Sequence, residues 1–461
     1  MAEKVKTTLY FDGHAVSKSQ KFFLVIAALT YAFDLMDVAI FGIVSPILVE
    51  NYGLTNENIS NLTFIFFVGS MLGATFGGIM ADKIGRKKAM LLNIMIFSLA
   101  SLANALWQPH YFMLLEISRF ATGFGTMAAV SVAVAYISEM LPAEKRGKYQ
   151  SLTLGAGTFS VPFVAVLAAT VATASAESWR YVFAIGAAML LLVPVAIKYL
   201  EESPRYLISK GKVKEAEDVM QRCLGFECDM SEAYENYSKS VANYKKISFD
   251  AQMKILFGKQ QRRQTLVCLM FALCLGCGNN MMMNYNNVFL VEMGFPLATV
   301  LLVGALTAFG QPVGELLSSL FSDKGGRTLP IFFYCGIAGI ISILLGFITS
   351  PLQYGVLQFI KTLFTAGAMA LLMTYIPESF PTSVRSSATG YIYAIQRIVI
   401  AFTAYLVLAC YNAGGWLYCM IANAAFWLVA AFVILFFGKR TAMQNIDAMH
   451  TECALCEDEE K

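Results

Sequence analysis

The sequence predicts an all-α membrane protein that folds into two pseudo-symmetric bundles of six transmembrane helices. Hydrophobic residues make up 57% of the 461 residues and charged residues only 14%, whereas soluble proteins carry about 25% charged residues. Twelve apolar stretches approach the roughly 20 residues that a spanning helix needs. Two unrelated motifs also recur at nearly the same offset along the chain, which indicates that one half duplicates the other.

The predicted spans follow one another closely along the chain. Lysine and arginine concentrate in the even-numbered loops, the termini and a long central segment, so the positive-inside bias places both termini in the cytoplasm. The polar first twenty residues argue against a cleaved signal peptide. We therefore expect a multi-pass protein of the cell (plasma or inner) membrane. Its twelve spans lie at about 22–49, 59–80, 89–107, 111–138, 149–172, 179–200, 264–290, 297–321, 329–349, 352–376, 387–411 and 415–437.

These spans divide the chain into five parts. Within the central part, Val213, Ala216, Met220 and Leu224 recur at helical spacing among charged residues. This pattern predicts one short amphipathic helix that lies against the inner face of the membrane. The five expected parts are a cytoplasmic N-terminal segment at 1–21, a first bundle at 22–200, a cytoplasmic central loop at 201–262, a second bundle at 263–437 and a cytoplasmic tail at 438–461.

A strip of glycines and a basic turn mark the end of the second span. Gly73, Gly77 and Gly78 lie at about four-residue spacing, which predicts close packing of another helix. The pattern G-x-x-x-D-K-x-G-R-K then begins at Gly78 and resembles the loop 2–3 signature of the major facilitator superfamily of transporters. The resemblance implies the fold of that superfamily. The signature residues are Gly78, Asp82, Gly85 and Arg86, and their partial repeat is Asp323, Gly326 and Arg327.

A second charged motif repeats with nearly the same offset. Glu139 and Arg146 follow the fourth span, and Glu378 and Arg385 follow the tenth. Opposite charges at helix ends beside a basic turn predict an ion-pair lock on the cytoplasmic side, which breaks as the two halves rock. Transporters built by duplication carry their substrate site where the halves meet.

The first span contains two carboxylates. Asp34 and Asp37 are three residues apart and therefore share one helical face. A carboxylate at this depth usually faces a cavity and has a function, although a neutral, hydrogen-bonded carboxyl that joins helices is the alternative. Arg119 in the fourth span lies at a comparable depth, ~12 Å from the outer end of its helix. Because an arginine stays charged, it needs a nearby anion.

These residues also resemble two branches of the superfamily. The D-x-x-D spacing of Asp34 and Asp37 is similar to a signature of the aromatic acid:proton symporters, although Leu35 and Met36 replace its central residues. Asp37 and the R-x-x-x-G-x-G segment from Arg119 resemble sugar porters as well. The resemblance to the xylose–proton symporter type implies that Asp37 and Arg119 form a proton-coupling pair.

Later spans supply candidate substrate-binding residues. The sixth span ends in Glu201–Leu207, which resembles the P-E-S-P-R-[WY]-L motif of sugar porters and organic-ion carriers. Asn280 and Tyr285 in the seventh span fit the sugar-porter pattern, but its paired glutamines are replaced here, which argues against a hexose. An asparagine-rich helix that only bonds its neighbours is the alternative. The remaining candidates at membrane depth are Gln311, Glu315, Lys361 and Arg397.

The buried charges suggest how transport could be coupled. An organic carboxylate bound by Lys361 or Arg397 would repel the resident aspartates and favour their protonation. We therefore expect a proton-coupled symporter of a small organic acid, with aromatic acids among the candidates, that works by alternating access. A proton-coupled sugar or polyol porter and a proton-driven efflux antiporter are the alternatives, and a non-transporting sensor is a further one.

Other functions find no support in the sequence. No nucleophile–base spacing indicates an enzyme, and no basic–aromatic stripe indicates nucleic-acid binding. Cys453 and Cys456 form a lone CxxC, which is half of a usual four-ligand metal site. We expect no cofactor and no metal, a monomeric protein, and the lipid bilayer, a small molecule and protons as its partners.

Overall fold

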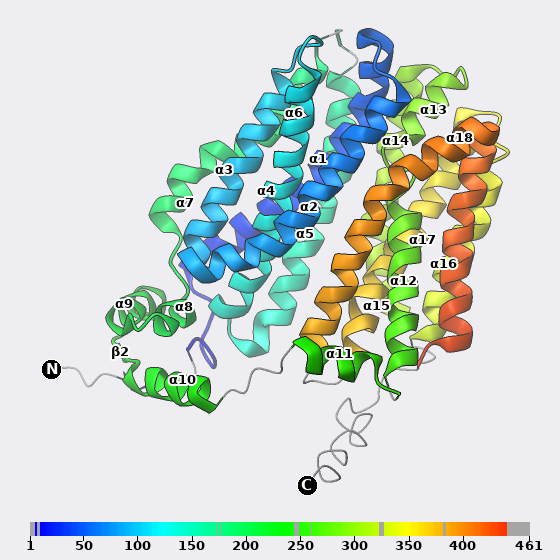
Figure 1. Cartoon of the computed structure of the whole chain (residues 1–461). Coiled ribbons are helices and arrows are strands. Elements are labelled where there is room, and N and C mark those ends of the chain that lie inside the picture. The colour runs from blue at the N-terminus through cyan, green and yellow to red at the C-terminus, as the bar shows by residue number, and fades with distance from the viewer. Residues whose placement is uncertain are drawn as a thin grey trace. The chain divides into compact units, whose positions relative to one another are not determined.

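The structure of this chain is a computed structural model that describes residues 5–6, 10–172, 174–175, 177–243, 249–259, 261–321, 327–380 and 384–439. The described residues are mostly helical (Figure 1). Among them, nine helical segments are long and apolar enough to cross a membrane. The chain forms two compact units, Met1–Ile40 with Ile65–Lys246 and Phe41–Phe64 with Ile247–Lys461. The boundaries expected from the sequence stay a prediction.

The first unit contains most of the N-terminal half. Within it, α3 packs against both α4 and α6. The sixth predicted span is interrupted by one 3₁₀ segment, η1 (Ala188–Leu192), between two α-helices. The spanning helices are α1 (Lys18–Tyr52), α2 (Asn56–Ile84), α3 (Arg86–Ala105), α4 (Phe112–Met140), α5 (Ala143–Val171), α6 (Trp179–Ala187) and α7 (Val193–Tyr199).

Glycines bring α2 and α4 into backbone contact. A Cβ on Gly69 would lie 2.3 Å from the carbonyl oxygen of Phe120, and one on Gly73 would lie 2.1 Å from that of Phe124. A Cβ on Gly77 would lie 2.7 Å from Ala128 Cα of α4, so the predicted close packing is confirmed for Gly73 and Gly77. It is wrong for Gly78, where an added Cβ would have no neighbour within 4 Å, because the residue that directly follows Gly77 points about 100° away around the helix.

The N-terminal segment and the central segment fold together. Strand β1 (Val5–Lys6) pairs in parallel with β2 (Cys228–Asp229). Phe11 is 1% exposed and belongs to the same apolar core as Met220 and Met230. The central segment contains α8 (Pro204–Ser209), α9 (Val213–Leu224) and α10 (Ser231–Asn243), so the structure adds helices to the single amphipathic one that the sequence predicts, α9.

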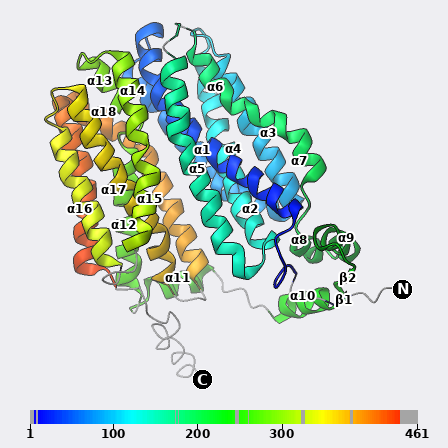
Figure 2. The same cartoon turned by 180° about the vertical axis from the view of Figure 1, so that it is seen from behind.

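The second unit carries the remaining spans. Helix α11 (Phe249–Phe257) lies across the end of α12 (Figure 1), and α14 and α15 follow each other along one line (Figure 2). Non-helical backbone at Gly414 and Gly415 divides α18 into the last two predicted spans. The other helices are α12 (Arg262–Asn280), α13 (Asn286–Glu292), α14 (Leu297–Ala308), α15 (Gly310–Phe321), α16 (Thr328–Leu345), α17 (Pro351–Glu378) and α18 (Arg385–Phe437).

The seventh span is not the continuous helix that the sequence predicts. Helix α12 ends at Asn280, residues 281–285 form turns, and α13 begins at Asn286. Asparagine favours such interruptions because its side chain competes for backbone hydrogen bonds. Here the Asn280 amide donates to the carbonyl of Gly276 at 2.9 Å. The interruption places three methionines, Asn284 and Tyr285 at a break within an apolar span.

Candidate functional site

Asp37 and Arg119 form a buried ion pair in the first unit. Arg119 Nη1 donates to Asp37 Oδ2 at 2.8 Å, and Arg119 is 1% and Asp37 5% exposed. The Arg119 guanidinium also lies over the ring of Phe66, 4.5 Å from its centroid. Helix α1 carries the aspartate and α4 the arginine, so the structure brings together two residues that the sequence placed at comparable depth.

The burial of this pair makes each partner depend on the other. Removing one member of a buried ion pair costs about 3–5 kcal/mol, because the remaining charge has lost both water and its partner. Protonation of Asp37 would likewise be unfavourable, because the buried Arg119 guanidinium would lose its counterion. The pair can therefore link a proton to helix packing between α1 and α4. Asp34 is half-buried one turn earlier in α1, and the coupling roles of all three residues stay predictions.

The second unit contains a buried cation of a different kind. Lys361 in α17 is 5% exposed, and no ion pair joins it to a carboxylate anywhere in the described parts of the chain. Buried charges are normally paired. Lys361 therefore differs from Arg119, whose charge is balanced inside its own unit.

Helix α15 packs directly beside Lys361. A Cβ on Gly310 would lie 2.8 Å from the carbonyl oxygen of Phe359, and one on Gly314 would lie 2.0 Å from that of Leu363. These glycines thus hold α15 against the α17 segment that contains the lysine. Two half-buried candidates, Gln311 and Glu315, belong to the same turn of α15, and a third, Arg397, is half-buried in α18. Their binding roles stay predictions.

Polar residues near the break in the seventh span bond to the ends of α1 and α2 that belong to the second unit. Tyr285 donates to Ser60 Oγ at 2.8 Å, and the side-chain amide of Asn287 donates to the carbonyl of Gly42 at 2.9 Å. Tyr285 is 1% exposed. These contacts show a structural task for Tyr285 and Asn287. The predicted roles of Asn280 and Tyr285 in substrate binding are not tested by them.

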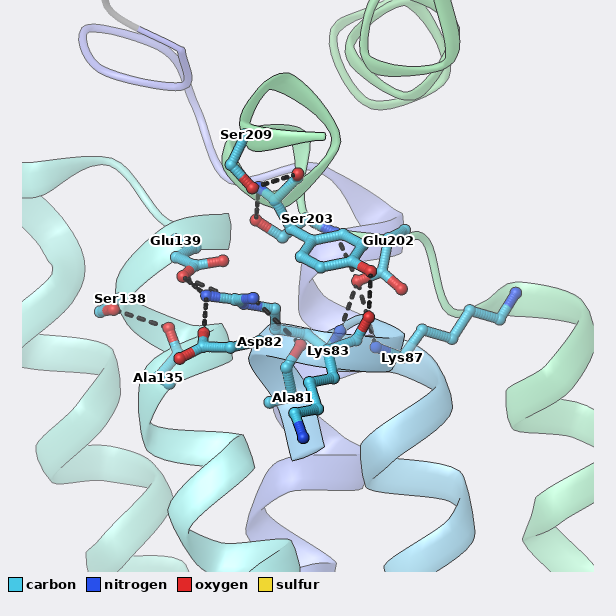
Figure 3. Close-up of polar contacts among 12 residues, drawn as sticks. Ala81, Asp82, Lys83, Lys87, Ala135, Ser138, Glu139, Glu202, Ser203 and Ser209 are labelled. Carbon is cyan, nitrogen blue, oxygen red and sulfur yellow. Dashed lines mark hydrogen bonds and ion pairs between the residues drawn. The ribbon is translucent and has the colours of Figure 1, made fainter. Parts of the chain in front are cut away.

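The basic turn after α2 forms an ion-pair cluster with α4. Arg86 contacts Glu139 at 2.8 Å and Asp82 at 2.9 Å. Figure 3 shows the carboxylates of Asp82 and Glu139 on the same side of the turn, with dashed lines for these contacts. The predicted contact between the charged end of the fourth span and this turn is confirmed, and its role as a lock stays a prediction.

Glu202 completes the cluster from the segment after α7. Its Oε1 atom accepts the backbone N–H groups of Arg86 at 2.8 Å and Lys87 at 3.2 Å (Figure 3). These groups open α3 and have no carbonyl partner within the helix. Gly85 precedes them with φ at 99°, and a Cβ there would lie 2.3 Å from Glu202 Oε2. Burial raises the pKa of the Glu202 carboxyl above its ordinary value, against the lowering effect of these hydrogen bonds.

Sequence reasoning does not assign this contact to Glu202. The motif Glu201–Leu207 is the available signal in the sequence. It indicates that this segment is important but does not indicate which residues Glu202 contacts. The sequence indicates Gly85 only as part of a signature, whereas the structure shows that its positive φ and missing side chain make room for the Glu202 carboxylate.

The second unit repeats part of this cluster. Arg327 Nε lies 2.8 Å from Glu378 Oε2, as the duplicated motif suggested. Asp323 and Gly326 lie outside the described residues, and so do the side chains of Arg146 and Arg385. Among the residues that the structure does describe, no group of three or more His, Cys, Asp or Glu side chains could hold a metal ion.

Comparison with known proteins finds relatives among transport proteins. Residues 18–452 match the family described as "Sugar (and other) transporter". A putative metabolite transport protein, YyaJ of Bacillus subtilis, is 30% identical over 93% of this chain and 94% of its own length. The niacin transporter NiaP of Acinetobacter baylyi is 26% identical over 81% of this chain and 83% of its own length.

Solved structures show the same fold. The inward-open xylose transporter XylE of Escherichia coli superimposes with a TM-score of 0.72, at 18% sequence identity, and the match covers 94% of this chain and 99% of that one. The two-bundle architecture of twelve spans that the sequence predicts is thereby confirmed.

Proposed function

Because this chain belongs to the sugar (and other) transporter family and is a multi-pass membrane transporter rather than an enzyme, we propose that it cotransports a proton and a small organic acid. Transport would follow alternating access. The protein would act as a monomer in the lipid bilayer. The positive-inside bias supports cytoplasmic termini, and a location in the cell membrane is part of the proposal.

The observation that carries this proposal is the difference between the two buried cations. Arg119 has Asp37 at 2.8 Å, whereas Lys361 forms no ion pair with a carboxylate of the described chain. A substrate carboxylate would supply the missing anion, and a neutral sugar would not. The similarity to a protein named a niacin transporter is consistent with a carboxylate substrate, since niacin is itself a carboxylic acid.

The carboxylate at Asp37 gives the proton a binding place. When it is charged, it balances Arg119, and when it is protonated, the arginine loses its counterion. A bound organic anion adds negative charge, which favours protonation of a nearby carboxylate. Proton and anion together leave the total charge of the protein with its cargo unchanged. The proton-symporter named among the structural relatives is in keeping with this coupling.

Uptake by reconstituted vesicles tests the proposal. A one-unit pH gradient is worth 1.36 kcal/mol per proton, so electroneutral one-to-one symport should concentrate a substrate acid about tenfold. Carboxylates should accumulate and an uncoupler should abolish the gradient. Asp37→Asn should still exchange substrate across the membrane but should not concentrate it. Accumulation by this variant equal to that of the native protein would contradict the coupling role of Asp37.

A sugar or polyol porter is the second candidate. The family description and the fold shared with a xylose transporter favour it. In the same vesicles, it would show uptake of neutral sugars in place of carboxylates, and Lys361→Met would leave that uptake intact. A proton-driven efflux antiporter would instead concentrate substrate only when the pH gradient is reversed.

A further inference from the structure

A basic pocket lies where α11 meets the start of α12. It has a volume of about 510 Å³ and is lined by Phe257, Lys259, Arg262, Arg263 and Leu266. Three of the five lining residues are cationic and two are apolar. None is acidic, so the pocket joins positive charge to hydrocarbon surface within one unit of the protein.

Neighbouring contacts fix the walls of this pocket. Thr265 Oγ1 donates to the carbonyl oxygen of Leu256 at 2.7 Å, which ties α12 to α11. Tyr391 donates to Gln252 Oε1 at 2.7 Å, which ties α18 to the same helix. Leu256 is 2% exposed and packs in the apolar core of the second unit. These two hydrogen bonds and the burial of Leu256 therefore hold helix α11 across the end of α12 (Figure 1).

The described residues offer no carboxylate partner to the cations of the pocket, Lys259, Arg262 and Arg263. No side chain caps the N-terminus of α12, whose helical residues begin at Arg262, so the positive end of the helix dipole adds to the three cations. An anion placed here would meet the side-chain donors of these three cations.

The apolar part of the lining narrows the type of anion. Phe257 is 49% exposed and Leu266 is 43% exposed. The Arg263 guanidinium lies 5.7 Å from the centroid of the Phe437 ring at the end of α18. A soluble phosphate would use the cations alone. A phospholipid would use the cations for its headgroup and the exposed rings and methyl groups for its chains, as in basic pockets between transmembrane helices.

We propose that this pocket binds the phosphate of an anionic phospholipid in the leaflet at this end of the helices. The lipid would lie with its headgroup against Lys259, Arg262 and Arg263 and its chains along Phe257 and Leu266. Its binding would steady α12, the helix that ends at the break after Asn280, without taking part in substrate recognition.

Lipid binding by the purified full-length protein tests this assignment. The protein is stripped of lipid in detergent, and the bound fraction of short-chain phosphatidylglycerol is measured by native mass spectrometry. Arg262→Gln with Arg263→Gln should weaken binding by at least about tenfold, since a charge-assisted contact to phosphate contributes that much or more. Lys254→Gln removes one charge from an exposed position of α11 outside the pocket and should change binding by less than about twofold, because that charge does not touch the headgroup.

Further measurements separate the lipid from other anions and from misfolding. Phosphatidylcholine should bind more weakly than phosphatidylglycerol, and inorganic phosphate at the same concentration should not displace the lipid. Displacement by inorganic phosphate would overturn the lipid assignment in favour of a soluble anion. If the double variant unfolds early, the exposed Lys259→Gln replaces it. Equal loss in Lys259→Gln and Lys254→Gln, or no loss in the pocket variants, would also overturn the proposal.

Discussion

Replacing Lys361 by methionine should make the protein more stable and abolish its binding of carboxylates. The lysine is 5% exposed and lacks an ion-pair partner among the described residues. Methionine has a similar length and no charge, so the substitution removes the desolvation cost without leaving a large cavity. Replacing a buried ion pair by apolar residues of similar volume is often neutral or stabilises a protein by about 1–4 kcal/mol, and for this single buried lysine we expect a gain of the same order.

Equilibrium unfolding in detergent, with and without ligand, measures both effects. A ligand at a hundred times its Kd stabilises a protein by about 2.7 kcal/mol. The native protein should gain this amount from its carboxylate substrate, and Lys361→Met should gain nothing. Lys361→Arg keeps the positive charge and should retain part of the response. A methionine variant that is less stable than the native protein, yet binds carboxylates with unchanged affinity, would refute the reasoning.

Three further predictions concern the cluster around Arg86. Gly85→Ala should lower the unfolding free energy by about 1–3 kcal/mol, because a φ of 99° is strained for alanine and the added Cβ would lie 2.3 Å from Glu202 Oε2. The control is Gly78→Ala. Its added Cβ has no neighbour within 4 Å, so the unfolding free energy should change by less than about 0.5 kcal/mol. Glu139→Gln should cost about 1 kcal/mol, because the ion pair with Arg86 is partly exposed; no change in unfolding would show that this pair is only incidental. Since burial raises the pKa of Glu202 above 4.5, its contribution to stability is largest below that pH and is lost as the pH rises through the folded pKa. Glu202→Gln should remove this slope from unfolding measured upward from pH 4.5, and parallel curves for the two proteins would contradict it.

The contact between Asp37 and Arg119 shows what a membrane sequence allows one to predict. Both residues lie in spanning helices, and a rise of about 1.5 Å per residue fixes their depth once the ends of the spans are known. A buried arginine requires an anion, and few carboxylates share its depth. Only a few carboxylates can then be the partner of Arg119, and each candidate partner fixes which helical faces must contact each other.

Other features depend on contacts that depth does not fix. Glu202 bonds to the start of α3 more than a hundred residues earlier, and its neighbours in the sequence carry no sign of that partner. Hydropathy does not reveal the break after Asn280, because it measures composition and not backbone hydrogen bonding. Local glycine density omits Gly69 from the packing strip and wrongly includes Gly78, whereas packing against α4 selects residues four apart.

The segment ahead of α1 resembles a dispensable polar leader in composition, but Phe11 is almost fully enclosed and β1 supplies the only neighbour that β2 has in the described sheet. Trimming the chain to the first spanning helix would leave a hole of phenylalanine size in the core shared with α9 and α10, and losses of this kind cost about 3–5 kcal/mol. Shortened versions made for expression should therefore keep this segment, since α9 and α10 of the central segment pack against it.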